Sequence, residues 1–128
     1  MPIPKKLLLT WLGHSTFKLT TPEGKIVLID PWVDGNPACP AGAKNFDRLD
    51  LILITHGHSD HMGDALALAK KYQPHIISIF EIGLWLEGKG VGNLHPMGKG
   101  GTQTLEGITV TMTQAHHSSS ILDEGKMV

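Results

Sequence analysis

The chain is poor in cysteine, in net charge and in long hydrophobic runs. Cys39 is the single cysteine among 128 residues, so no disulfide can form within the chain, which is compatible with a reducing compartment. Eleven Lys and Arg residues nearly balance twelve Asp and Glu residues, and the formal net charge is −1. The chain therefore lacks a basic field of the kind that binds nucleic acid, and we expect no nucleic-acid partner.

The hydrophobic run near the N-terminus is short. Residues 1–6 include two lysines, and only three leucines follow before Thr10. A stretch this short and this soon interrupted fits neither a signal peptide nor a membrane span. We therefore expect a cytoplasmic protein without a membrane partner. A chain of 128 residues is also expected to form a single domain over residues 1–128.

The first part of the chain has the alternation and the turn residues of short strands. Strands are predicted over residues 7–12, 15–20 and 25–29, arranged as an antiparallel meander. Prolines, glycines and asparagines then break any period over residues 31–50, and we expect a loop on the rim of a pocket. Within this loop, Cys39 is expected to be an exposed thiol.

Strands and helices alternate in the rest of the chain. The pattern predicts a strand over residues 51–55, a helix over 62–72, a strand over 75–80, a short helix over 82–86 and a strand over 108–113. This order favours an α/β fold in which helices pack on one face of a mixed sheet.

Three histidines and a carboxylate lie on the predicted turn between the strand over residues 51–55 and the helix that follows. They are His56, His58, Asp60 and His61. In α/β proteins this edge of the sheet is where sites are built, and imidazole and carboxylate are ligands that zinc prefers. His56 and His58 could hold one ion, and Asp60 and His61 a second. The alternative is that the histidines are surface residues and that Asp60 only caps the helix.

A second pair of histidines follows the predicted strand over residues 108–113. His116 and His117 are expected at the same edge of the sheet as His56. An ion held by His56 and His58 needs a third protein ligand, and adjacent residues in an extended segment point opposite ways. One of the two histidines therefore fits, but spacing alone does not choose between them.

Three further polar residues lie at strand ends. His14 interrupts the first strand pair and is either a histidine bonded to a backbone carbonyl or part of a site. Asp30 ends the third strand and is either a turn residue or a partner that fixes the tautomer of a ligand histidine. Thr55 directly precedes His56, and its hydroxyl could orient that imidazole.

These motifs carry a family resemblance. The segment HGHSDH at residues 56–61 resembles the H-x-H-x-D-H signature of the metallo-β-lactamase superfamily. The segments WLGHS at 11–15, LIDP at 28–31 and AHHSS at 115–119 occur in the order found in small bacterial and archaeal metal-dependent hydrolases, which are related to lactonases. The resemblance implies an αβ/βα sandwich, of which this chain would be the N-terminal half.

The resemblance also implies roles for individual residues. It makes His117 the third ligand of the first metal and leaves His116 to pack or to face the pocket wall. It places His14 near the pocket, in contact with substrate or with a ligand, and not as a ligand itself. It puts an acid at Asp30 behind the ligands. The implied cofactor is one or two divalent ions, zinc first, with manganese or iron as alternatives.

The activity expected from these features is metal-dependent hydrolysis of a small molecule. A metal-bound hydroxide would attack an ester, lactone, amide or phosphoester, and Asp60 would take the proton from the attacking water. The second half of the family domain supplies further ligands, so the second metal site is expected to be weak or empty here.

Without that second half, one face of the sheet is expected to be bare. A large exposed apolar patch of this kind marks an interface. We therefore expect self-association, or a second chain that supplies the missing C-terminal half. The alternative to an enzyme is a non-catalytic or truncated half-domain that binds metal and completes its fold with another chain.

Overall fold

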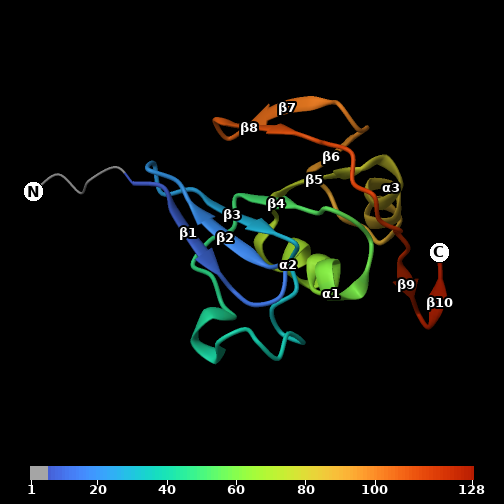
Figure 1. Cartoon of the computed structure of the whole chain (residues 1–128), viewed down its shortest axis with the longest axis horizontal. Helices are drawn as coiled ribbons and strands as arrows, with labels where there is room; N and C mark the ends of the chain where they lie inside the picture. The colour runs from blue at the N-terminus through green and yellow to red at the C-terminus, as the bar shows by residue number, and fades with distance from the viewer. Residues whose placement is uncertain (1–5) are drawn as a thin grey trace, which may run out of the picture.

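A six-stranded mixed sheet forms the centre of the molecule. The computed structural model describes residues 6–128. Residues 1–5, which belong to the segment considered above as a signal peptide, lie outside the described residues. The strands follow in the order β1 (Leu8–Trp11), β2 (Phe17–Thr20), β3 (Ile26–Ile29), β4 (Leu51–Leu53), β5 (His75–Ile79) and β6 (Leu94–Met97). β1 to β3 pair antiparallel and β3 to β6 pair parallel, which confirms the predicted meander and mixed sheet (Figure 1).

The helices lie between and after the parallel strands. They are α1 (Ser59–Met62), α2 (Ala65–Tyr72) and α3 (Phe80–Gly88), with a 3₁₀ turn at Ala41–Ala43. The prediction of one helix over residues 62–72 is wrong, because Asp64, with φ −102° and ψ 4°, leaves the helical conformation between α1 and α2. Its carboxylate accepts the backbone N–H groups of Val33 at 2.6 Å and Asp34 at 2.9 Å. Asp64, which breaks the helix, therefore holds the start of the loop over residues 31–50 in place.

Both faces of the central strands are covered. The core on the helix side includes Leu28, Ile52 and Ile76, and the core on the other side includes Val27, Leu51 and Ile77. β7 (Thr102–Leu105) and β8 (Ile108–Thr111) form a separate hairpin over this second face, opposite α1 and α2 (Figure 1). The expectation of helices on one face is confirmed. The expectation of a bare opposite face is wrong over β3 to β5, because the hairpin, including β8, packs there.

The loop over residues 31–50 is tied to the turn between β1 and β2. The buried Asn36 side chain donates to the carbonyls of Gly13 at 3.1 Å and Trp32 at 3.0 Å. A Cβ on Gly13, whose φ is +100°, would lie 2.7 Å from the Cβ of Ala38. Because the loop passes so close, Cys39 is 6 % exposed and its burial raises the pKa of its thiol. The expectation of an exposed thiol is therefore wrong.

The C-terminal segment is anchored to α3. β9 (Leu122–Asp123) and β10 (Lys126–Met127) form a small hairpin. The Asp123 carboxylate accepts the indole N–H of Trp85 at 2.9 Å and pairs with the Lys89 ammonium at 2.8 Å. This anchor fixes one end of the segment that carries residues 117–120 past the turn after β4. None of the helices within residues 6–128 combines the length and the hydropathy that a membrane span requires.

The packing of α3 predicts a contrast between two leucines of that helix. Leu86 is fully buried and Leu84 is 49 % exposed. We expect Leu86→Ala to lower the free energy of unfolding by about 2–5 kcal/mol, because it leaves a cavity. Leu84→Ala is expected to cost less than about 1 kcal/mol, as at other surface positions. Urea denaturation followed by circular dichroism measures both, and equal losses would contradict the placement of α3.

Candidate metal centre

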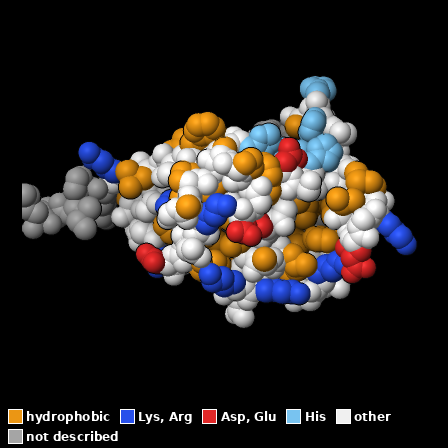
Figure 2. Space-filling view, turned by 90° about the horizontal axis from the view of Figure 1, so that it is seen from below, with side chains coloured by type: hydrophobic (Ala, Val, Ile, Leu, Met, Phe, Trp, Pro, Cys, Tyr) orange, Lys and Arg blue, Asp and Glu red, His pale blue; other side chains and the backbone are white. Residues whose placement is uncertain are grey.

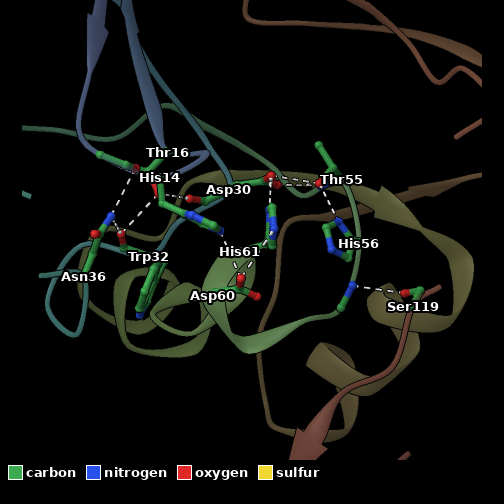
Figure 3. Close-up of polar contacts among 12 residues, drawn as sticks. His14, Thr16, Asp30, Trp32, Asn36, Thr55, His56, Asp60, His61 and Ser119 are labelled. Atoms are coloured by element: carbon green, nitrogen blue, oxygen red, sulfur yellow. Dashed lines mark hydrogen bonds and ion pairs between the residues drawn. The ribbon is translucent and has the colours of Figure 1, made fainter. Parts of the chain in front are cut away.

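Histidines and carboxylates from four separate segments meet beyond the C-terminal ends of β3 and β4. The segments are the turn after β1, the residue after β3, the turn from β4 into α1, and the stretch after β8 (Figure 3). In Figure 2 the histidine side chains gather on one part of the surface around an acidic side chain. The Lys and Arg side chains in the same view lie on other parts of the surface. The arrangement concentrates neutral and anionic donors, which is what a cation requires.

Three imidazoles form the first group of donors. One ring nitrogen each from His56, His58 and His117 lies within 4.8 Å of the other two. The ring centroid of His56 is 4.7 Å from that of His58 and 4.7 Å from that of His117. Among residues 6–128, the Nε2 atom of His56 is the buried side-chain polar atom without a hydrogen-bond partner.

That unpartnered nitrogen fits a metal. Leaving a buried polar atom unpaired costs about 1–3 kcal/mol, so its persistence beside two further imidazoles needs a reason. Three histidines with an open fourth position are a known arrangement for catalytic zinc. Burial lowers the pKa of His56, and the neighbouring His61 and His58 lower it further. The imidazole is therefore neutral at pH 7, which is the form that binds a metal.

The buried carboxylate of Asp30 sets the orientation of two of the histidines. Asp30 is 2 % exposed and accepts the backbone N–H of Thr55 at 2.8 Å, the Thr55 hydroxyl at 2.8 Å and the Nδ1–H of His61 at 2.7 Å. Because the hydroxyl hydrogen of Thr55 goes to Asp30, its oxygen accepts the Nδ1–H of His56 at 2.9 Å. Both His56 and His61 then present an Nε2 lone pair toward the centre.

A second group of donors contains Asp60, His61 and His14. The Asp60 Oδ2 atom lies 3.0 Å from Nε2 of His14 and 3.9 Å from Nε2 of His61. Burial would raise the pKa of Asp60, but a backbone hydrogen bond, His61 and His14 together outweigh it and lower the pKa. The carboxylate is therefore ionised, so this group could also hold a cation (Figure 3).

The structure separates the two adjacent histidines that spacing could not distinguish. His117 lies in the first group, whereas His116 is exposed and makes no recorded hydrogen bond or ring contact within residues 6–128. Thr55 hydrogen-bonds to the ring of His56, and Asp30 hydrogen-bonds to Thr55 and to the ring of His61. Of the loop expected at the rim, Trp32 lies against His14 at 5.5 Å between centroids, while residues 45–48 line a separate hollow.

Sequence reasoning missed the contact that brings His117 into place. The backbone N–H of Gly57 donates to the Ser119 hydroxyl at 3.0 Å. A Cβ on Gly57 would lie 2.7 Å from the carbonyl oxygen of Ser120, so glycine is needed because the two segments touch. Gly57 within the motif is the one signal in the sequence, and it does not reveal which segment approaches.

A cleft of about 330 Å³ opens beside the first group. It is lined by Thr55, His56, Ile79, Lys99, Met112, Thr113, Ala115, His117 and Ser119. Apolar side chains from the sheet and from the end of the hairpin thus form its walls, with one ammonium group at the side. The cleft has room for a small molecule next to the His56 imidazole.

The chain is similar in sequence to known proteins. Residues 25–127 match the family described as "Beta-lactamase superfamily domain". A "UPF0173 metal-dependent hydrolase" of Solibacter usitatus is 52 % identical over 120 residues, which is 94 % of this chain and 52 % of that protein. One of Koribacter versatilis with the same description is 53 % identical over 122 residues, which is 95 % of this chain and 52 % of that protein.

A solved structure is similar as well. Igni18, described as a novel metallo hydrolase from the hyperthermophilic archaeon Ignicoccus hospitalis, superimposes with a TM-score of 0.77 at 36 % identity. The match covers 88 % of this chain and 50 % of that one. The expected fold and the expected resemblance are confirmed. The chain spans about half the length of the curated relatives it matches.

The role of Asp30 leads to a prediction for Asp30→Asn. An amide nitrogen facing His61 would donate to Nδ1 and shift the proton to Nε2, which removes a donor from the centre. We expect zinc affinity to fall by about 10–100-fold, the usual effect of losing a partner behind a ligand. Competition with a chromophoric chelator measures the affinity.

Asp50→Asn is the matched control for that variant. The Asp50 carboxylate is also largely buried and accepts the backbone N–H of Ile26 at 2.8 Å, but it lies before β4, away from the histidines. We expect it to change stability and to leave zinc affinity unaltered. Equal losses of affinity in the two variants would show that Asp30 acts only through folding.

Proposed function

The chain belongs to the beta-lactamase superfamily, and we propose that it carries a metal-dependent hydrolytic centre held by His56, His58 and His117. The observation that carries the proposal is the buried, unpartnered Nε2 atom of His56, which faces two further imidazoles. The relatives from Solibacter and Koribacter, described as metal-dependent hydrolases, support the same chemistry.

Some residues of this chain would bind or orient the metal ligands, and another would transfer a proton. A bound divalent ion, zinc by the donor set with manganese or iron as alternatives, would lower the pKa of water and polarise the scissile group. Asp30 and Thr55 hold the imidazoles of His56 and His61 in the ligating tautomer. The ionised carboxylate of Asp60, which is 45 % exposed, accepts the proton of the attacking water.

The cleft beside His56 supports a small molecule as substrate. Its walls are mostly apolar, and Lys99 is the charged side chain among its lining residues. A substrate with an apolar part and an anionic group would match both features. Esters, lactones, amides and phosphoesters remain the bonds that such a centre hydrolyses.

A second candidate function is a half-domain that becomes complete only with another chain. All four residues of β1 are exposed, with Leu8 at 54 % and Leu9 and Trp11 at 63 % each. Leu7, directly before β1, is also 63 % exposed. β1 is the edge strand of the sheet, so its outer backbone groups can pair with another strand. We propose that a second copy of the chain covers β1 by antiparallel pairing.

Hydrolysis that depends on the metal is the first prediction of the proposed function. The purified chain is loaded with zinc, manganese or iron(II) and assayed with neutral and anionic esters, lactones, amides and phosphodiesters. We expect turnover that a chelator abolishes and the metal restores. His56→Ala should lower kcat/KM by at least about 100-fold, since it removes a ligand rather than a residue behind one.

His95→Ala is the control for that assay. His95 lies in β6, its ring contacts His75 at the start of β5, and neither belongs to the groups of metal donors. It should retain the activity of the unaltered chain. Turnover that survives both the chelator and His56→Ala would contradict the proposal.

Self-association is the prediction of the second candidate. Sedimentation velocity should show a mass that rises with concentration, and Leu7→Lys combined with Leu9→Lys should abolish the rise, because charged side chains block edge pairing. Leu84→Lys, at an exposed site on α3, is the matched control and should leave association intact. A monomer at every concentration would contradict pairing of two copies through β1.

A further inference from the structure

We infer that the second metal position is a complete three-ligand site within this chain and that His14 is its third protein ligand, beside Asp60 and His61. The inference rests on the proposed function, because it concerns the same centre. It differs from what the family resemblance implies, which places His14 near the pocket but not among the ligands. It also removes the reason for expecting that position to be weak or empty.

The donor atoms of the three residues already converge. One donor each from His14, Asp60 and His61 lies within 4.8 Å of the other two. The rings of His14 and His61 are 5.2 Å apart at 62°, and Asp60 lies between their Nε2 atoms (Figure 3). Two imidazoles and one carboxylate suit zinc, manganese and iron.

The tautomer of His61 suits this role. Its Nδ1–H is donated to the buried Asp30 at 2.7 Å, so its Nε2 lone pair faces Asp60. His14 points its own Nε2 atom at the Asp60 carboxylate, 3.0 Å away. A cation that replaces the proton between His14 and Asp60 would meet three donors at one point.

The backbone around His14 is held in a strained conformation that aims the ring. His14 has φ +52°, in the left-handed region that residues other than glycine rarely adopt. Its carbonyl accepts the indole N–H of Trp11 at 2.9 Å, and the preceding carbonyl of Gly13 accepts from the buried Asn36. Strain of this kind persists where the surroundings over-determine it, and it clusters at functional sites.

A plain ion pair between His14 and Asp60 explains these observations less well. Both side chains are almost half exposed, at 44 % and 45 %, and exposed ion pairs contribute little to stability. A weak surface contact gives no reason for a strained turn clamped by Trp11 and Asn36. Ligation of a cation does, because a ligand must be fixed in place.

The two metal positions would then be adjacent, and this chain would provide the same number of donor atoms to each. The rings of His56 and His61 are 4.0 Å apart, with one in each group. Each position would have three protein donors from this chain. A second ion beside the first would add positive charge that stabilises the developing negative charge of a hydrolysis.

The test is metal content and affinity of the whole chain, without any substrate. Equilibrium dialysis against zinc, followed by elemental analysis, should give about two ions per chain. Each group offers three protein ligands, the number that a tetrahedral catalytic zinc site uses. His14→Asn should retain one ion and bind the second more than about 100-fold less tightly, beyond the effect of losing a residue behind a ligand. Asparagine tolerates the left-handed conformation, so the turn should persist.

Two further variants make the result decisive. His117→Ala should lose the first ion and keep the second, and His116→Ala, the neighbouring exposed histidine, should keep both. Two ions bound with unaltered affinity in His14→Asn would overturn the inference. One ion in the unaltered chain, lost in His117→Ala, would also overturn it and leave the proposed function standing, whereas no ion at all would overturn both.

Discussion

A single buried carboxylate holds the centre together. Asp30 is the residue directly after β3, with φ +51°, and its own N–H bonds to the carbonyl of Leu53 in β4. A charge buried to this extent is stable only when it is fully hydrogen-bonded. Thr55 and His61 provide those bonds from the turn after β4 and from α1. The same contacts that stabilise the charge therefore fix the tautomers of two candidate ligands.

Around that carboxylate, the fold brings four distant segments to one edge of the sheet. The parallel strands β3 and β4 place Asp30 beside Thr55, and the turn clamped by Asn36 places His14 opposite Asp60. The anchor of Asp123 on α3 and the contact between Gly57 and Ser119 carry the last segment across the turn. The candidate metal centre therefore depends on tertiary contacts at each of its sides.

The sequence predicts the local part of this arrangement. Strand and helix periodicity predicts the mixed sheet, and HGHSDH predicts the donors that lie within a few residues of one another. Periodicity does not predict contacts between distant segments. The burial of Cys39, the break at Asp64, the position of β8 in a separate hairpin and the approach of Ser119 to Gly57 all depend on such contacts. The convergence of His14 on Asp60 has the same origin, since 46 residues separate them.

The most direct test of the central claim is the protonation of the ring nitrogens of His56 and His61 in the metal-free chain. Long-range ¹H–¹⁵N NMR at pH 7 distinguishes a protonated Nδ1 from a protonated Nε2. If Asp30 and Thr55 organise the centre, both rings carry the proton on Nδ1, and zinc moves the Nε2 resonances of both. Protons on Nε2, or Nε2 resonances that zinc leaves unchanged, would contradict the account.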